Sequence, residues 1–275
     1  MTGQAAVRRA PGSRLLGVVM LGIGAFLLLP LLNLVLWAFA GRWFYPSLLP
    51  QAWSLQWFRY VFSQGHLTHA IVLSLTFAPI VTLVACFVCL PAAYAFGRFD
   101  FFARRSLMIG ILATNAFPRF GLYIGLATIL YGLNLVDTAL GVVIVQLLGT
   151  LVPMTWIAAA AFGGVPRELE QAARDAGAGP MRTFARITLP VAAPGVLVAV
   201  ILAFLAAFDE AQGTFLVGMP RYQTMPIMMY SIVAGYPEPA AAVFSMVLAT
   251  PSFILLLLVR RYIIGGSIAA GFSLL

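Results

Sequence analysis

Six stretches of this chain are each long and apolar enough to cross a membrane as a helix, and this feature limits the possible folds more than any other. A helix needs about 20 mostly apolar residues to span the hydrocarbon core of a bilayer. Because no water reaches that core, the backbone must satisfy its own hydrogen bonds, as it does in a helix. The sequence therefore predicts an all-α, polytopic membrane fold with six transmembrane helices, at residues 15–39, 69–96, 106–131, 139–162, 191–217 and 240–264.

The overall composition excludes an ordinary soluble domain. Of the 275 residues, 62% are hydrophobic and only 9% are charged, whereas soluble domains are about 25% charged. The third and fifth apolar stretches contain charges together with glycine or proline, so their boundaries are the hardest to place. We expect a single membrane domain at residues 15–264, with cytoplasmic segments at 1–14 and 265–275.

The positive charges of the chain are distributed unevenly among the predicted loops. Loops on the cytoplasmic side of a membrane carry an excess of Lys and Arg. With both termini in the cytoplasm, three arginines lie outside (Arg42, Arg59 and Arg221) and Arg119 lies within a span. The remaining arginines all lie inside: Arg8, Arg9, Arg14, Arg98, Arg104, Arg105, Arg167, Arg174, Arg182, Arg186, Arg260 and Arg261. The distribution predicts cytoplasmic N- and C-termini.

The basic residues also exclude two classes of function. All 16 are arginine, and a nucleotide-binding P-loop needs a lysine to reach the phosphates. The chain therefore has no standard ATP site, and any ATP and Mg would be bound by a partner. A net charge of +8 could indicate nucleic-acid binding, but the arginines lie at the ends of apolar segments rather than along one stripe. We expect membrane lipid, and no nucleic acid, around this chain.

One polar loop, residues 163–190, interrupts the apolar sequence between the fourth and fifth spans. Pro166 is suited to the first turn of a helix, after which Leu169, Ala172, Ala173 and Ala176 recur with helical spacing. Gly177 is suited to a left-handed C-terminal cap, and Pro180 can begin a second helix. The loop is predicted to hold two short amphipathic helices, with an apolar face that can lie on the transmembrane bundle.

This loop carries a recognisable sequence pattern. From Gln171 it follows x-A-A-x-x-x-G-x(9)-I-x-L-P, and so resembles the signature loop of permease subunits in binding-protein-dependent ABC importers. The segments Leu73–Leu75, Pro91–Ala95 and Phe117–Pro118 look like the same family, so the resemblance covers nearly the whole chain. The family usually has Glu at the first signature position; here it is Gln171, and the preceding Glu170 is expected to replace its charge.

The resemblance implies a non-catalytic subunit of the bacterial inner membrane that forms half of a solute pathway. In the family, the signature loop docks into a groove on a separate ATPase. Implied partners are a second homologous permease, two ATPase subunits and a periplasmic or lipid-anchored solute-binding protein. The implied ATPase-coupling residues are Glu170, Gln171, Ala172, Ala173, Asp175, Gly177, Ile187, Leu189 and Pro190.

Polar residues inside two of the spans are candidates for the solute pathway. Charges within a membrane are costly and are usually functional. Asn115 and Arg119 lie in the third span, and Asp209, Glu210 and Gln212 lie in the fifth. These residues could line the pathway, Arg119 could pair with either acid to lock the two spans together, or the acids could reach the membrane interface. Adjacent helical residues point about 100° apart, so the two acids are not expected to share one role.

The transported solute is suggested by weaker features. The position of Asp175, the acidic pair 209–210 and the segment 222–242 look like the spermidine/putrescine branch, which predicts a polyamine or a similar small polar solute. The C-terminal RRYIIGGSIAAGF has features of the maltose type, and Arg119 would suit an anion. A sugar or small organic-anion importer is therefore the alternative.

Functions of another class are an ATP-independent carrier or channel, or a polytopic membrane enzyme. The sequence contains no catalytic constellation and no paired inverted repeats that would favour either of them. His66 and His69 have no third metal ligand at recognisable spacing, so no metal site is predicted. The aromatic outer loop 40–68 is typical of interfacial anchoring, with contact to an external partner protein as the alternative.

Overall fold

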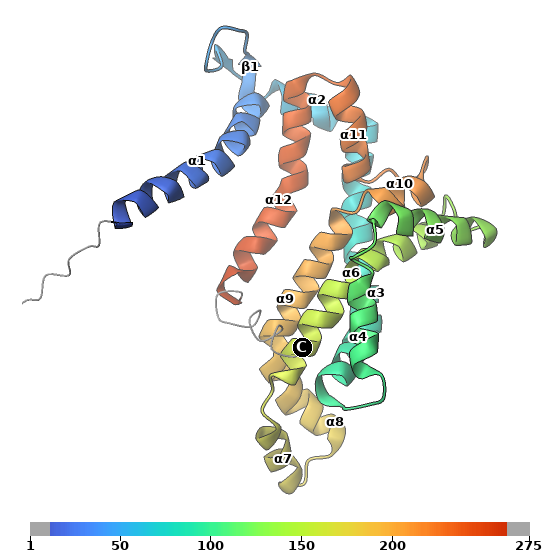
Figure 1. The fold of residues 1–275 in the computed structure, drawn as a ribbon. Helices are drawn as coiled ribbons and strands as arrows, with labels where there is room; N and C mark the ends of the chain where they lie inside the picture. The colour runs from blue at the N-terminus through green and yellow to red at the C-terminus, as the bar shows by residue number, and fades with distance from the viewer. Residues whose placement is uncertain (1–11, 263–275) are drawn as a thin grey trace, which may run out of the picture.

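The computed structural model describes residues 12–262, and over that range the chain is predominantly helical. Residues 1–11 and 263–275, which include most of the two predicted terminal segments, lie outside the described residues. The described residues form a helical bundle whose centre consists of α3 (Gly65–Arg98), α6 (Ala139–Gly163) and α9 (Leu189–Phe208). Figure 1 shows these three helices side by side. The expected all-α class is confirmed, apart from two short strands described below.

Small residues allow the central helices to pack closely. The buried faces of α3, α6 and α9 include Ala85, Ala93, Ala158, Ala199 and Ala203. Packing between membrane helices depends on van der Waals contact at small residues, because lipid provides no hydrophobic force to drive the helices together. The alanines on these faces therefore allow the three helices to pack closely at the centre of the bundle.

Among residues 12–262, five helices are long and apolar enough to cross a membrane: Leu16–Phe39, Gly65–Arg98, Ala139–Gly163, Pro180–Phe208 and Glu238–Leu258. The third predicted span, 106–131, is not confirmed as a single membrane-spanning helix, because it is divided into α4 (Arg104–Ala113) and α5 (Arg119–Gly132). Pro118 lies at this division; it lacks an N–H and disfavours the α conformation in the residue before it. Figure 1 shows α5 turned away from the direction of α4.

The fifth predicted span, 191–217, is also interrupted. Helix α9 ends at Phe208, and a separate helix α10 (Gln212–Gly218) follows. α10 lies against α5 and leaves the bundle on the same side (Figure 1). The predicted spans with internal charges are therefore the two that contain helix breaks.

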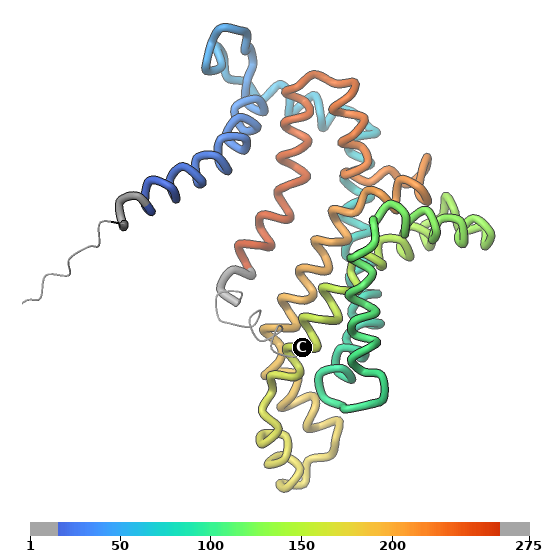
Figure 2. Tube along the Cα trace, viewed as in Figure 1, coloured from blue at the N-terminus to red at the C-terminus, as the bar shows by residue number. Residues whose placement is uncertain are grey.

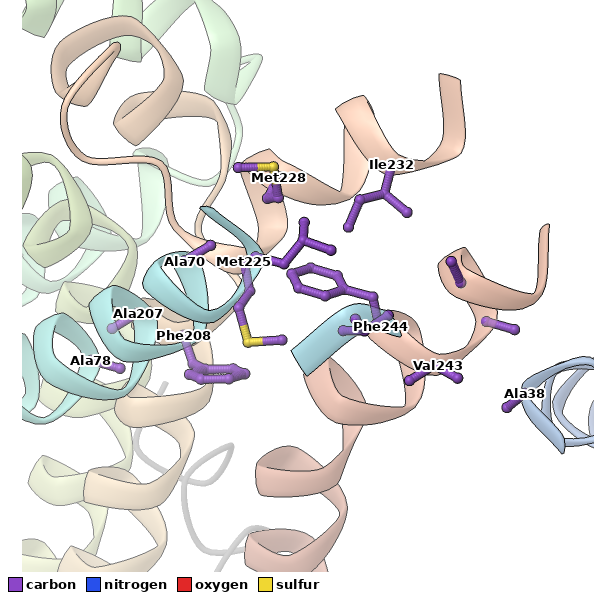
Figure 3. Packing of buried hydrophobic residues seen from close by; sticks show 14 of the residues in the cluster. Ala38, Ala70, Ala78, Ala207, Phe208, Met225, Met228, Ile232, Val243 and Phe244 are labelled. Carbon is purple, nitrogen blue, oxygen red and sulfur yellow. The ribbon is translucent and has the colours of Figure 1, made fainter. Parts of the chain in front are cut away.

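The chain returns to the bundle through α11 (Met225–Gly235) and α12 (Glu238–Tyr262). With α2 (Gln56–Ser63) and the beginning of α3, they form a second apolar cluster (Figure 3). Phe208, Met225, Ile232 and Phe244 are among its most buried side chains. This cluster fixes the end of the bundle opposite the polar loop.

The first helix, α1 (Gly12–Phe39), lies largely apart from the bundle. Figures 1 and 2 show it leaning away, and most side chains between Leu16 and Val35 are exposed. Only its last turns approach α12, where Ala38 lies near Val243 (Figure 3).

The loop at 40–68, which the sequence predicts to lie outside, contains a short hairpin that the sequence did not predict. β1 (Ala40–Arg42) and β2 (Ala52–Trp53) pair antiparallel, with Ala40 opposite Trp53. The Trp57 indole of α2 donates a hydrogen bond of 3.0 Å to the Ala40 carbonyl. Tyr45 at the tip of the hairpin is 98% exposed.

Candidate functional site: a protruding helical loop and two helix breaks

The polar loop forms one end of the molecule and projects beyond the helices of the bundle there (Figure 1). Its first helix is α7 (Arg167–Asp175), followed by α8 (Pro180–Thr183) and a π-helical turn, η1 (Phe184–Thr188). The expected second helix is therefore present, but it does not end before the next span: Pro180 to Phe208 is one continuous helical run. A π turn inside a helix is a local irregularity that is often found at functional sites.

A tight glycine turn closes α7. Gly177 has a φ of 83°, in the left-handed region that glycine adopts without a Cβ clash. Its N–H bonds the Arg174 carbonyl at 2.8 Å, and the Ala178 N–H bonds the Ala173 carbonyl at 2.9 Å. These two bonds form a Schellman motif, which satisfies the last carbonyls of the helix. The expectation of a left-handed cap at Gly177 is confirmed.

The apolar side of α7 does not lie on the bundle, which corrects the sequence expectation. Leu169 is 46% exposed, and Ala172 and Ala176 are exposed as well. Glu170 is instead the buried residue of the helix. α7 therefore exposes Leu169 and two alanines, and a charged side chain holds it to the bundle.

Glu170 is held by contacts to two other elements. Arg98, in the last turn of α3, forms an ion pair with Glu170, and the two side chains are 6% and 11% exposed. The Thr188 hydroxyl donates a hydrogen bond of 2.5 Å to Oε1 of the same carboxylate. Arg98 also donates to the Val165 carbonyl at 2.8 Å, just before α7 begins. One carboxylate thus joins α7 to the end of α3 and to the π turn before α9.

The electrostatic environment keeps Glu170 ionised. Burial by itself raises the pKa of its carboxyl group, since it disfavours the charged form. Hydrogen bonds from Thr188 and Arg98, with the charges of Arg98 and Arg174, outweigh burial and leave the pKa below its ordinary value. A buried carboxylate with these partners is a fixed anion rather than a proton carrier.

This geometry changes the role expected for Glu170. We expected it to replace the missing charge at Gln171 on the docking surface, but its carboxylate faces the bundle. Gln171 and Asp175 are exposed on α7. Further along, Ile187 is half-buried, and Leu189 and Pro190 are exposed at the start of α9. Sequence reasoning missed Arg98 and Thr188, because Arg98 was one of many arginines at the end of an apolar segment.

The five pathway candidates lie at the two helix breaks, but their environments differ. Glu210 is 6% exposed, and its carboxylate accepts hydrogen bonds from the backbone N–H groups of Gly213 at 2.6 Å and Thr214 at 2.9 Å. The Thr214 hydroxyl adds a third bond of 2.5 Å, and Gln146 of α6 donates to that hydroxyl at 3.1 Å. Glu210 therefore caps the first turn of α10 and is not available to a solute.

The other four candidates are exposed: Asn115, Arg119, Asp209 and Gln212. Arg119 donates a long hydrogen bond of 3.4 Å to Asn115, one turn earlier. The ion pairs of the described residues do not include Arg119 with Asp209 or Glu210, so the structure does not support the hypothesis that such a pair locks the two spans. Asp209 and Glu210 have different environments, as expected, but they lie in the break between α9 and α10 rather than on one helix as the sequence argument assumed.

A cavity beside the first break is small. It is lined by Thr114, Asn115, Arg119, Tyr123 and Gly149 and has a volume of about 20 Å³, enough for about one water molecule. His66, in the first turn of α3, is not among the residues that line this cavity and lies 2.5 Å from the Tyr236 hydroxyl. Within the described residues, this cavity beside the first break is too small to hold a solute.

A bundle of long apolar helices with one projecting helical loop is the architecture of a polytopic membrane protein. The chain belongs to the family of binding-protein-dependent transport system inner membrane components, whose pattern it matches over residues 89–268. It is thus a permease subunit of an ABC importer, an integral inner-membrane protein with no enzymatic activity of its own; a partner ATPase hydrolyses ATP. The family also implies a solute-binding protein as partner.

Individual relatives agree with this family. ORF1 of Streptomyces antibioticus, named as an ABC transporter permease, is 32% identical over 76% of this chain and 92% of its own. The trehalose transport permease SugB of Mycobacterium tuberculosis is 27% identical over 80% of this chain and 82% of its own. The trehalose/maltose permease MalG of Thermococcus litoralis is 29% identical over 70% and 71%.

A solved structure shares the fold. A chain of a bacterial ABC transporter involved in the import of the acidic polysaccharide alginate matches with a TM-score of 0.73, over 94% of this chain and 99% of that one, at 16% identity. The relatives named above are sugar permeases where a solute is named, so the expected spermidine/putrescine branch is not supported.

Proposed function

We propose that this chain is a permease subunit of a sugar importer, with a di- or oligosaccharide as its solute. The proposal rests on the relatives that are named for trehalose, maltose and maltodextrin transport. It replaces the polyamine expectation with the sugar alternative. The exposed polar groups at the helix breaks, which include an amide at Asn115 and another at Gln212, are suited to hydrogen bonds with sugar hydroxyls.

The solute pathway is proposed to lie between this chain and a second, homologous permease. Charged groups at membrane depth normally face a partner or a water-filled cavity. Arg119 and Asp209 are exposed on this chain, and the only space beside Arg119 among the described cavities is water-sized. A partner permease facing the two helix breaks would complete a polar pathway there.

The coupling surface is proposed to be the outward side of α7 and the turn that follows. Leu169 and Ala172 form an apolar patch on a helix that projects from the bundle, beside the exposed Gln171 and Asp175. Such a patch would be covered by docking into a groove on an ATPase, with one ATPase subunit for each of two permeases. ATP and Mg would then be bound by the ATPase and not by this chain.

The membrane orientation is proposed to place the α7 end in the cytoplasm. The elements at that end carry Arg98, Arg104, Arg167, Arg174 and Arg182. Cytoplasmic loops of membrane proteins carry such an excess of basic residues. Both termini would then be cytoplasmic, and the hairpin with α2 would face the solute-binding protein.

The test is sugar uptake by the complete complex in liposomes. The chain is co-expressed with its ATPase, second permease and binding protein, and uptake is measured with ATP for trehalose, maltose, maltodextrin, alginate oligosaccharides, putrescine and spermidine. We expect ATP-dependent uptake of one sugar class and stimulation of ATP hydrolysis by the same sugar. Uptake of polyamines alone would refute the sugar assignment, and uptake without an ATPase would refute the coupling.

A further inference from the structure

The polar contact beneath α7 differs from the surface proposed to dock. It lies on the opposite side of the helix, is nearly inaccessible to solvent, and involves residues from three elements separated in sequence. Building on the proposed function, we propose that Glu170 is a positioning residue that fixes α7 to the transmembrane helices, so that movement of α7 is transmitted at once to α3 and α9.

The first connection runs to α3. Arg98 is the last residue of that helix, and its guanidinium binds the Glu170 carboxylate while donating to the carbonyls of Phe162 at 3.4 Å and Val165 at 2.8 Å. Arg98 therefore joins the end of α3, the end of α6 and the start of α7. A planar guanidinium with several fixed donors is suited to such a junction.

The second connection runs to α9 through the π turn. Thr188 is 1% exposed, and its hydroxyl donates to the other oxygen of the same carboxylate. Thr188 is the last residue of η1 and directly precedes α9. A displacement of α7 therefore pulls on the base of α9 as well as on the end of α3.

The π turn lies between α8 and α9, inside one continuous helical run. An α-helix that runs without interruption from Pro180 into α9 would carry α8 rigidly with the span. The π turn at Phe184–Thr188 is the irregular segment of that run, and irregular turns are where helices bend. Glu170 attaches at the α9 end of this segment, so force from α7 reaches the span beyond the bend rather than being absorbed in it.

A docking role for Glu170 would predict different behaviour. A residue that contacts the ATPase would change the affinity between the subunits when it is replaced. A residue that transmits movement would leave assembly intact and change the number of solutes transported for each ATP hydrolysed. The transport-to-hydrolysis ratio therefore distinguishes transmission from docking and from a merely structural role, which would lower both activities in proportion to the amount of complex.

The test uses the complete complex in liposomes with Glu170→Gln, Thr188→Val, Thr188→Ser and the matched control Glu168→Gln. Glu168 is an exposed carboxylate on the same helix, so its variant makes the same charge change away from the contact. We expect Glu170→Gln and Thr188→Val to lower the ratio of transport to hydrolysis by about fivefold or more, the range in which coupling between sites is usually measured. Thr188→Ser keeps the hydroxyl and, like Glu168→Gln, is expected to keep the ratio.

A double-mutant cycle with Arg98→Gln tests whether the pair acts as one unit. If Arg98 and Glu170 act through their mutual contact, the ratio of transport to hydrolysis in the double variant is no lower than in the worse single variant. The reason is that the effects of replacing two residues in contact are not additive. An unchanged ratio in assembled Glu170→Gln and Thr188→Val complexes would overturn the proposal. If Glu170→Gln does not assemble, the Thr188 pair decides alone, and equal ratios for Val and Ser overturn it.

Uptake by the wild-type complex distinguishes a failure of this proposal from a failure of the proposed function. A wild-type complex without ATP-driven uptake would contradict the proposed function itself. Normal wild-type uptake with an unchanged ratio in the variants would contradict only the role of Glu170.

Discussion

Gly97 of α3 lies directly against the backbone of Ala159 in α6. A Cβ added to Gly97 would lie 2.6 Å from the Ala159 carbonyl oxygen, closer than real contacts allow, and 3.0 Å from the Gly163 N, which is a tight contact. The two helices therefore touch backbone to backbone one residue before Arg98, and the position of Arg98 under α7 depends on this close approach.

Replacing Gly97 with Ala is expected to destabilise the bundle. The neighbouring atoms belong to backbone and cannot move aside, so the helices must separate, at a cost of about 1–3 kcal/mol. Thermal unfolding of the purified chain in detergent measures the change. Gly110→Ala is the control, since Gly110 is a helical glycine with open space around its added Cβ; an equal loss of stability in both variants would contradict the close approach.

Gly177→Val is expected to disrupt the end of α7 and weaken association with the ATPase. A β-branched residue at a φ of 83° is strained by about 1–2 kcal/mol. Gly179 has a φ of −68° and open space nearby, so Gly179→Val introduces the same side chain without that strain. Co-purification of the ATPase with each variant checks the prediction. Full ATPase recovery and full transport with Gly177→Val would show that the shape of this turn is unimportant.

Features that depend on neighbouring residues were predicted from the sequence, and contacts between residues far apart along the chain were not. Local rules identified the long apolar helices and the glycine cap, and the charges, glycine and proline of the third and fifth apolar stretches marked their boundaries as the hardest to place. The Arg98–Glu170 contact joins residues 72 positions apart, and no local pattern indicates such a pair. For the same reason, the apolar side of α7 was expected to face the bundle, although a distant arginine turns its charged side inward.

Glu210→Ala is expected to destabilise the chain. It leaves the N–H groups of Gly213 and Thr214 without their buried acceptor, and each unsatisfied group costs about 1–3 kcal/mol. The measurement is thermal unfolding of the chain in detergent, compared with Asp209→Ala. Asp209 is exposed next to it, so its loss is expected to leave the unfolding temperature nearly unchanged. A larger shift for Asp209 than for Glu210 would contradict the capping role.

Arg119→Gln and Asp209→Asn are expected to impair transport rather than folding. Both side chains are exposed at the helix breaks, so neutral replacements of similar shape leave the packing intact. If they face the pathway, initial uptake rates fall about 10-fold or more, equivalent to the loss of roughly 1.4 kcal/mol of interaction. Uptake kinetics in liposomes at matched protein levels provide the measurement, and wild-type rates in both variants would exclude these residues from the pathway.

The attachment of α7 is expected to persist from neutral pH down to about pH 5. The pKa of Glu170 is lowered in the folded chain from its ordinary 4.5, and the groups facing it are Arg98 of α3, Thr188 of η1 and Arg174 of α7. A lowered pKa gives stability that is complete above the ordinary value and is lost as the pH falls through the folded value. Amide hydrogen exchange of α7, corrected for intrinsic rates, should therefore show the same protection at neutral pH and at about pH 5. In Glu170→Gln the protection is expected to be weaker at both values. Wild-type protection that disappears near pH 6 would mean that the pKa is raised instead.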